Sequence, residues 1–148
     1  MKLLRIVVIF ALMTCVAGAA DRKYINNSRP AGAQNLPFSD AVLVGNTLYI
    51  AGTIGLDPKT GLAPADAEQE AHLVMEGVKR TVESAGLTMD DVVSLQIFCT
   101  DLKLYDTFNG VYKNYFHGDF PARAFIGVNQ LVRNGKFEVM GIAVKKSQ

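Results

Sequence analysis

Phe120-Pro121-Ala122-Arg123-Ala124-Phe125-Ile126 is the stretch of this 148-residue chain that decides the fold. A proline biases the residue before it towards an extended conformation, so the apolar run that follows predicts a strand. Arg123 brings a permanent charge and a planar fork of donors into that strand. A charge in a half-buried strand is costly unless an anion meets it. Arg123 therefore pairs either with an internal Asp or Glu or with the carboxylate of a ligand.

Outward from this stretch, strands and helices alternate. Apolar residues at helical spacing predict a helix over 67–82, which Asp66 caps and Gly86 ends, and another over 104–116. Short apolar runs predict strands at 41–44, 47–52, 92–100, 122–128 and 137–144. The order β-β-α-β-α-β-β favours an α+β fold, with a single sheet and two helices on one face. Subunit contact would cover the other face, for which the candidate residues are Ile50, Ile97, Phe125 and Val139.

Several segments, taken in order, resemble the signature of the Rid family, the YjgF-like reactive intermediate deaminases. They are Val44 to Gly52, Asp57 to Gly61, Phe98 to Leu102, Phe108 to Tyr112, Pro121-Ala122-Arg123 and Lys136 to Val144. The resemblance covers nearly all of the chain after the first twenty or so residues. It implies a chorismate-mutase-like fold and a homotrimer with clefts between subunits. It also implies hydrolysis of enamine and imine intermediates, such as 2-aminoacrylate, to 2-keto acids and ammonia.

The resemblance assigns roles to five positions. Arg123 matches the family's carboxylate-binding arginine, and Glu138 matches the glutamate that orients the attacking water. Asn109 matches an asparagine near the pocket. The backbone around Ala51 and Gly52 matches the loop that lies against the ligand. A small carboxylate-bearing substrate is the implied partner.

Each role has a structural alternative that the sequence leaves open. Glu138 can form an ion pair with Lys136 or with Arg123. Asn109 can be a buried amide that satisfies backbone groups. Gly52 can serve a tight turn.

The sequence departs from the family pattern at three positions. Ala51 replaces a serine of the ligand loop, Phe38 replaces a tyrosine that follows a proline, and Phe125 replaces a cysteine two residues past the arginine. Two hydroxyls are thus missing, and Thr53 replaces one only if its side chain turns towards the site. Two hypotheses follow: a 2-iminobutanoate/2-iminopropanoate deaminase-like hydrolase, or a non-catalytic trimeric protein that binds small carboxylates.

The start of the chain predicts export. Residues 1–20 combine a basic start, an apolar run and small residues, which is the pattern of a cleaved secretory signal, and leave a single domain at 21–148. The run is too short for a membrane anchor. Cys15 suggests lipoprotein processing, although Thr14 before it is a poor fit. We expect a periplasmic or secreted protein that leaves the membrane after signal cleavage.

Composition excludes several classes of function. Removal of residues 1–20 takes away Lys2 and Arg5, which leaves 13 basic against 14 acidic residues, a net charge of −1. A near-neutral chain without a basic stripe argues against nucleic-acid binding. His72 and His117 lack metal-ligand spacing, and no glycine-rich phosphate loop is present, so we expect neither a metal nor a cofactor.

Overall fold

The computed structural model describes residues 21–26 and 36–146. The proposed signal segment therefore lies outside the described residues. The described chain forms one sheet of six strands in the order β1-β2-β3-β6-β4-β5. The strands are β1 (Arg22–Ile25), β2 (Ala41–Val44), β3 (Thr47–Ile54), β4 (Val92–Cys99), β5 (Ala122–Gly127) and β6 (Phe137–Val144). The two α-helices are α1 (Ala67–Ser84) and α2 (Tyr105–Tyr112).

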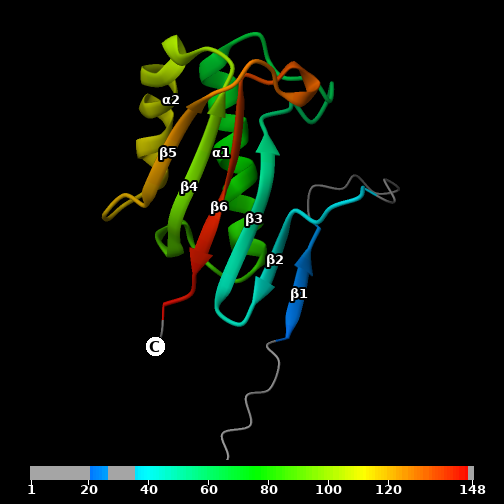
Figure 1. The fold of residues 1–148 in the computed structure, drawn as a ribbon, viewed down its shortest axis with the longest axis vertical. Helices are drawn as coiled ribbons and strands as arrows, with labels where there is room; N and C mark the ends of the chain where they lie inside the picture. Colours follow the sequence, from blue (N-terminus) through cyan, green and yellow to red (C-terminus); the bar gives the residue numbers. More distant parts are fainter. Residues whose placement is uncertain (1–20, 27–35, 147–148) are drawn as a thin grey trace, which may run out of the picture.

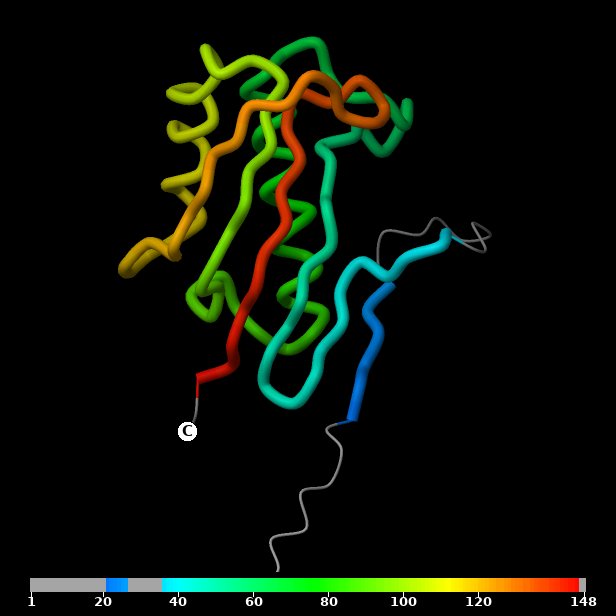
Figure 2. The backbone as a smooth tube through the Cα atoms, in the orientation of Figure 1, coloured from blue at the N-terminus to red at the C-terminus, as the bar shows by residue number. Residues whose placement is uncertain are grey.

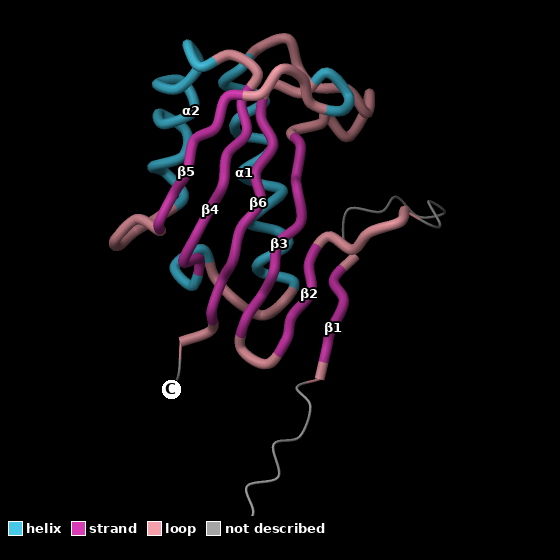
Figure 3. Tube along the Cα trace, in the orientation of Figure 1, coloured by secondary structure: helices cyan, strands magenta, loops and turns pink. Residues whose placement is uncertain are grey.

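Both helices lie on the same face of the sheet, behind it in the view of Figure 1. Figure 3 separates this helical layer from the strand layer by colour. The neighbouring strands are antiparallel except β4 and β5, which are parallel and are connected through α2. Figure 2 shows that β6, the last strand of the chain, runs between β3 and β4. The predicted α+β architecture is confirmed.

Helix α1 forms where the sequence predicts it. Its N-cap is Asp66, whose carboxylate accepts a hydrogen bond from the backbone N–H of Gln69 at 2.7 Å. The helix ends at Ser84, and Gly86 follows with a φ of +81°, which favours glycine. The inward face is fully buried against the sheet and includes Ala71, Val74, Met75, Val78 and Val82. Capping and periodicity therefore agree on this element.

Strand β1 is an addition to the predicted order. The sequence predicts no strand before residue 41, but Arg22–Ile25 pairs antiparallel with β2 at the sheet edge. Only Ile25 of this strand is buried. Because most of its residues are exposed, its sequence does not show the alternation of apolar and polar residues that predicts a strand.

The prediction of which residues lie on the open face of the sheet is wrong. Ile50, Ile97 and Val139 are at most 2 % exposed and belong to the core beneath the helices. Phe125 pairs in register with Ile97 and therefore shares that face. The open face instead presents alternate residues of the same strands, among them Tyr49, Met140 and Val144.

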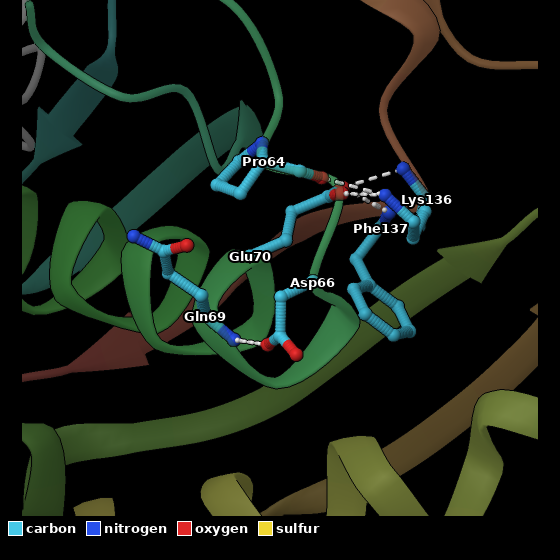
Figure 4. Close-up of polar contacts among 6 residues, drawn as sticks. All are labelled: Pro64, Asp66, Gln69, Glu70, Lys136 and Phe137. Carbon is cyan, nitrogen blue, oxygen red and sulfur yellow. Dashed lines mark hydrogen bonds and ion pairs between the residues drawn. The ribbon is translucent and has the colours of Figure 1, made fainter.

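A buried carboxylate fixes the start of β6 (Figure 4). Glu70 of α1 is fully buried, and its carboxylate accepts hydrogen bonds from the backbone N–H groups of Lys136 and Phe137. The Lys136 ammonium pairs with the same carboxylate at 3.1 Å and donates to the carbonyl of Pro64 at 2.7 Å. This cluster anchors β6 to α1 immediately before Glu138.

Candidate active site

Arg123 projects from β5 on the helical face of the sheet, in register with the buried Leu95 of β4. Its Nη1 donates to Oδ1 of Asn109 at 2.7 Å, and its Nη2 donates to the hydroxyl of Tyr105 at 3.2 Å. Both acceptors are neutral groups on α2. Among the described residues, no carboxylate pairs with Arg123. The internal ion pair that the sequence left open is therefore not formed there, and the charge remains available to a ligand.

Aromatic rings surround the guanidinium. Its central carbon lies 4.7 Å from the ring centre of Tyr112, 5.5 Å from that of Tyr105 and 5.9 Å from that of Phe125. Contacts of this kind are attractive because the π face of a ring is electronegative. They also restrict the orientation of the guanidinium.

A hollow of about 430 Å³ opens beside Arg123. Its lining consists of Asn109, Tyr112, Lys113, Phe120, Pro121 and Arg123. The described residues of this lining include two cationic side chains and no carboxylate, so the hollow attracts anions. Small-molecule sites in proteins have volumes of about 300–1,000 Å³, a range that includes this hollow.

The Tyr112 phenol is a buried polar group with no hydrogen-bond partner among the described residues. Burial raises the pKa of Tyr112 to about 12, although the nearby Arg123 charge acts in the opposite direction. The phenol is therefore neutral at physiological pH.

Phe125 packs into the core side of the site. Its ring contacts Tyr105 at 5.0 Å and Phe108 at 5.7 Å between centroids, both edge to face. It lies close to Arg123, as the sequence indicated, but it does not line the hollow. Its bulk supports α2 and does not narrow the hollow.

Glu138 follows directly on the anchored start of β6. Its neighbours Phe137 and Val139 are buried beneath the helices, so alternation places Glu138 on the open face. Lys136 pairs with Glu70, and Glu138 forms no ion pair with any residue in the described part of the chain. The ion pairs that the sequence allowed between Glu138 and Lys136 or Arg123 are therefore not formed.

The Glu138 carboxylate lies against the backbone of Gly52. A Cβ atom at position 52 would collide with Oε1 of Glu138. Gly52 sits where the pairing of β3 with β6 is irregular, between Ile50 and Thr53, and its φ is not positive. Glycine at this position thus permits a close approach of the carboxylate and does not serve a tight turn.

The remaining predicted residues do not gather around Arg123. Ala51 is part of the same irregularity as Gly52, and Phe38 is an exposed ring before β2; neither lines the hollow. Thr53 turns the other way: its methyl group lies 2.7 Å from the Cβ position of Gly77 on α1. Thr53 therefore does not supply a hydroxyl beside Glu138.

In a single chain the predicted site is divided between two surfaces. Arg123 and Asn109 lie on the helical face at the β5 edge, whereas Glu138 and Gly52 lie on the open face over β6 and β3. One subunit alone does not bring these groups together.

Two residues of the arginine site were missed in the sequence. Tyr105 and Tyr112 lie four residues before and three residues after Asn109 on α2. Positions at this spacing share one face of a helix. Helical spacing from Asn109 is therefore enough to predict that both tyrosines lie at the site.

Comparison with known proteins identifies the family. The model of the endoribonuclease L-PSP family matches residues 27–145. The chain is 37% identical over 125 residues to the bovine 2-iminobutanoate/2-iminopropanoate deaminase, covering 84% of this chain and 90% of that protein. The chain belongs to the Rid (YjgF-like) family, and the prediction of a deaminase-like enzyme is confirmed.

Solved structures agree with this assignment. The crystal structure of Escherichia coli TdcF with bound serine superposes with a TM-score of 0.76 at 35% identity, covering 84% of this chain and 99% of that one. The E. coli YjgF gene product gives a TM-score of 0.75 at the same identity and coverage. The fold is thus that of the family.

Residues 21–26 and 36–146 lack two further features. Neither helix there combines the length and apolar composition that a membrane crossing requires. No group of three or more His, Cys, Asp and Glu side chains in those ranges is placed to hold a metal ion.

Proposed function

We propose that this protein hydrolyses 2-imino acids, and their enamine tautomers, to 2-keto acids and ammonia. The observation that carries the proposal is Arg123, a partly buried guanidinium held by neutral acceptors on α2 and facing a hollow without carboxylates. Its remaining N–H groups can donate hydrogen bonds to a substrate carboxylate. The bovine relative is named for 2-iminobutanoate and 2-iminopropanoate, which belong to this class.

The chemistry requires an oriented water. Water adds to the imine carbon, and the resulting carbinolamine loses ammonia to give the keto acid. With the imine protonated, Glu138 takes a proton from the water as the C–O bond forms and returns it to the carbinolamine nitrogen. The carbinol hydroxyl then gives its proton to Glu138 as the C–N bond breaks, and ammonia leaves. Glu138 forms no ion pair with the described residues, which leaves its carboxylate available for this role.

The division of the site between two faces supports a shared site. We propose a homotrimer in which the Arg123 hollow of one subunit faces Glu138 and Gly52 of its neighbour. The exposed apolar side chains of the open face, including Tyr49 and Met140, provide the surface that such contact would cover. The substrate would then bind in the cleft between copies.

We also propose that residues 1–20 are a cleaved secretory signal and that the enzyme acts in the periplasm or outside the cell. The basic start and the short apolar run of this segment support the proposal. An exported enzyme would meet imines other than the short-lived products of cytoplasmic enzymes.

The test is imine hydrolysis followed by ammonia release, with imines generated in situ by an amino-acid oxidase. Wild type should accelerate hydrolysis, and Arg123→Ala should lower kcat/KM by about 100-fold or more because a charge-assisted anchor is lost. The matched control is Arg80→Ala, which removes an exposed arginine from α1. Equal rates for wild type and Arg123→Ala on every imine would refute the proposal.

The same variants separate catalysis from binding alone. A ligand that binds the folded state raises the melting temperature by mass action. Arg123-dependent stabilisation by 2-keto acids without any turnover would instead identify a carboxylate-binding protein. The loss of the Ala51 and Phe38 hydroxyls is the feature that favours this second candidate.

A further inference from the structure

We propose that the hollow beside Arg123 selects 2-imino acids with a large apolar or aromatic side chain, and that Phe120 is the selecting residue. This inference rests on the proposed function and adds a substrate class to it. It concerns the part of the hollow that a carboxylate on Arg123 would leave empty.

In a single subunit, the hollow is much larger than a small imino acid needs. A water molecule occupies about 30 Å³ of liquid, and a methyl group is of similar size. The methyl group of 2-iminopropanoate would therefore fill little of the roughly 430 Å³ available. Unfilled space forfeits packing contacts, so a larger side chain is favoured.

The wall of the hollow is aromatic. The rings of Tyr112 and Phe120 lie 6.1 Å apart between centroids and only 27° from parallel. Phe116 is buried behind these two rings, at 4.8 Å from Tyr112 and 6.0 Å from Phe120. Phe120 nevertheless remains 59 % exposed. It offers apolar surface that a ligand can cover.

The charges decide which end of the ligand goes where. Arg123 lies 4.7 Å from the Tyr112 ring, so a carboxylate bound to Arg123 is immediately beside the aromatic wall. Lys113 also lines the hollow and adds a second positive charge, with no carboxylate to oppose it. A molecule with a carboxylate at one end and an apolar group next to it matches this arrangement.

Burial of each additional methylene should improve affinity about fourfold. We therefore expect phenylpyruvate and 4-methyl-2-oxopentanoate, the keto-acid products of such substrates, to bind at least tenfold more tightly than pyruvate. Calorimetric titration of the purified full-length protein measures these dissociation constants directly. Imines generated from phenylalanine and leucine should show the same preference in kcat/KM over the imine from alanine.

The variants test the role of Phe120. Phe120→Ala should reduce the preference for phenylpyruvate over pyruvate to about threefold or less. Phe120→Leu should retain most of the preference for phenylpyruvate. The control is Leu62→Ala, which removes an equally exposed apolar side chain, 59 % exposed, from a loop that does not line the hollow.

Three results would overturn the inference. They are equal binding of pyruvate and phenylpyruvate by wild type, a preference that survives Phe120→Ala in a folded protein, or tightest binding of the dicarboxylate 2-oxoglutarate through Lys113. The outcomes also separate the two proposals. A size preference without turnover would refute the proposed deaminase function but support the size-selective hollow. Turnover without a size preference would support the deaminase function but refute the size-selective hollow.

Discussion

Arg123 illustrates how one residue can be structurally supported and still chemically available. Asn109 and Tyr105 accept two of its hydrogen bonds, and aromatic rings flank it. These contacts orient the guanidinium without neutralising it. A carboxylate partner would have satisfied the charge and closed the site. Neutral support is what an anchor for an anionic ligand requires.

Tyr112 provides a prediction at this scale. Its buried phenol lacks a partner among the described residues, and an unsatisfied buried hydroxyl costs about 1–3 kcal/mol. Tyr112→Phe should therefore raise the free energy of unfolding by about 1 kcal/mol, measured by urea denaturation at pH 7. A clear loss of stability would show that the hydroxyl has a partner in the assembled protein.

The same residue predicts a pH dependence. The folded pKa of Tyr112, about 12, lies above the ordinary value of 10, so the folded state holds this proton more tightly. The associated stability is fully present below pH 10 and is lost as the pH rises from about 10 to 12. Denaturation between pH 9 and 12 should show this decline, and Tyr112→Phe should make it shallower. A residual slope is expected because burial also raises the pKa of Tyr115.

At the scale of elements, the link from α1 to β6 positions the candidate catalytic strand. Glu70 holds the backbone of Lys136 and Phe137, and Glu138 is the next residue. Glu70→Ala should destabilise the protein by about 3–5 kcal/mol, because it leaves two backbone donors and the Lys136 ammonium without their partner.

Glu70→Gln is the matched variant. An amide oxygen can still accept from the backbone, so the loss of stability should be smaller than for alanine. Thermal and urea denaturation of both variants measure the difference. Equal destabilisation by Gln and Ala would indicate that the charge of Glu70, and not its acceptor geometry, holds the strand.

The same elements show how far sequence reasoning reaches. Helix α1 was predictable because its cap, its apolar spacing and its terminal glycine agree. Strand β1 was not, since most of its residues are exposed and only its pairing with β2 identifies it. The sequence analysis assigned Ile50 to the wrong face of the sheet, because Ile50 and the adjacent Tyr49 are both apolar. Alternation separates such residues into two sets but does not say which set the helices cover.

The candidate site divides in the same way. Its arginine half could be predicted: Arg123 and Asn109 came from the family resemblance, and the two tyrosines were within reach of helical spacing. The position of Glu138 on the opposite face follows only from the register of β6 against its neighbours. Register is a tertiary property, so the sequence alone did not reveal that the site is divided.

At the scale of the whole molecule, the export proposal gives a prediction of its own. Expression in a Gram-negative host should yield a mature protein that begins at Ala20 or Asp21, because the small residues before Asp21 suit signal cleavage. Intact-mass spectrometry of the periplasmic fraction measures this. An intact Met1 on protein from the cytoplasm would contradict export, and a lipid on Cys15 would place the protein at a membrane surface.

The central claim is a deaminase site that Arg123 of one subunit forms with Glu138 of another, and subunit complementation tests it most directly. Arg123→Ala and Glu138→Gln should each be nearly inactive. In trimers assembled at random from equal amounts of both, about one junction in four pairs an intact arginine with an intact glutamate. We predict that the mixture regains about a quarter of wild-type imine hydrolysis. Mixed trimers, verified by native mass spectrometry, with no more activity than the two variants measured separately would contradict the account.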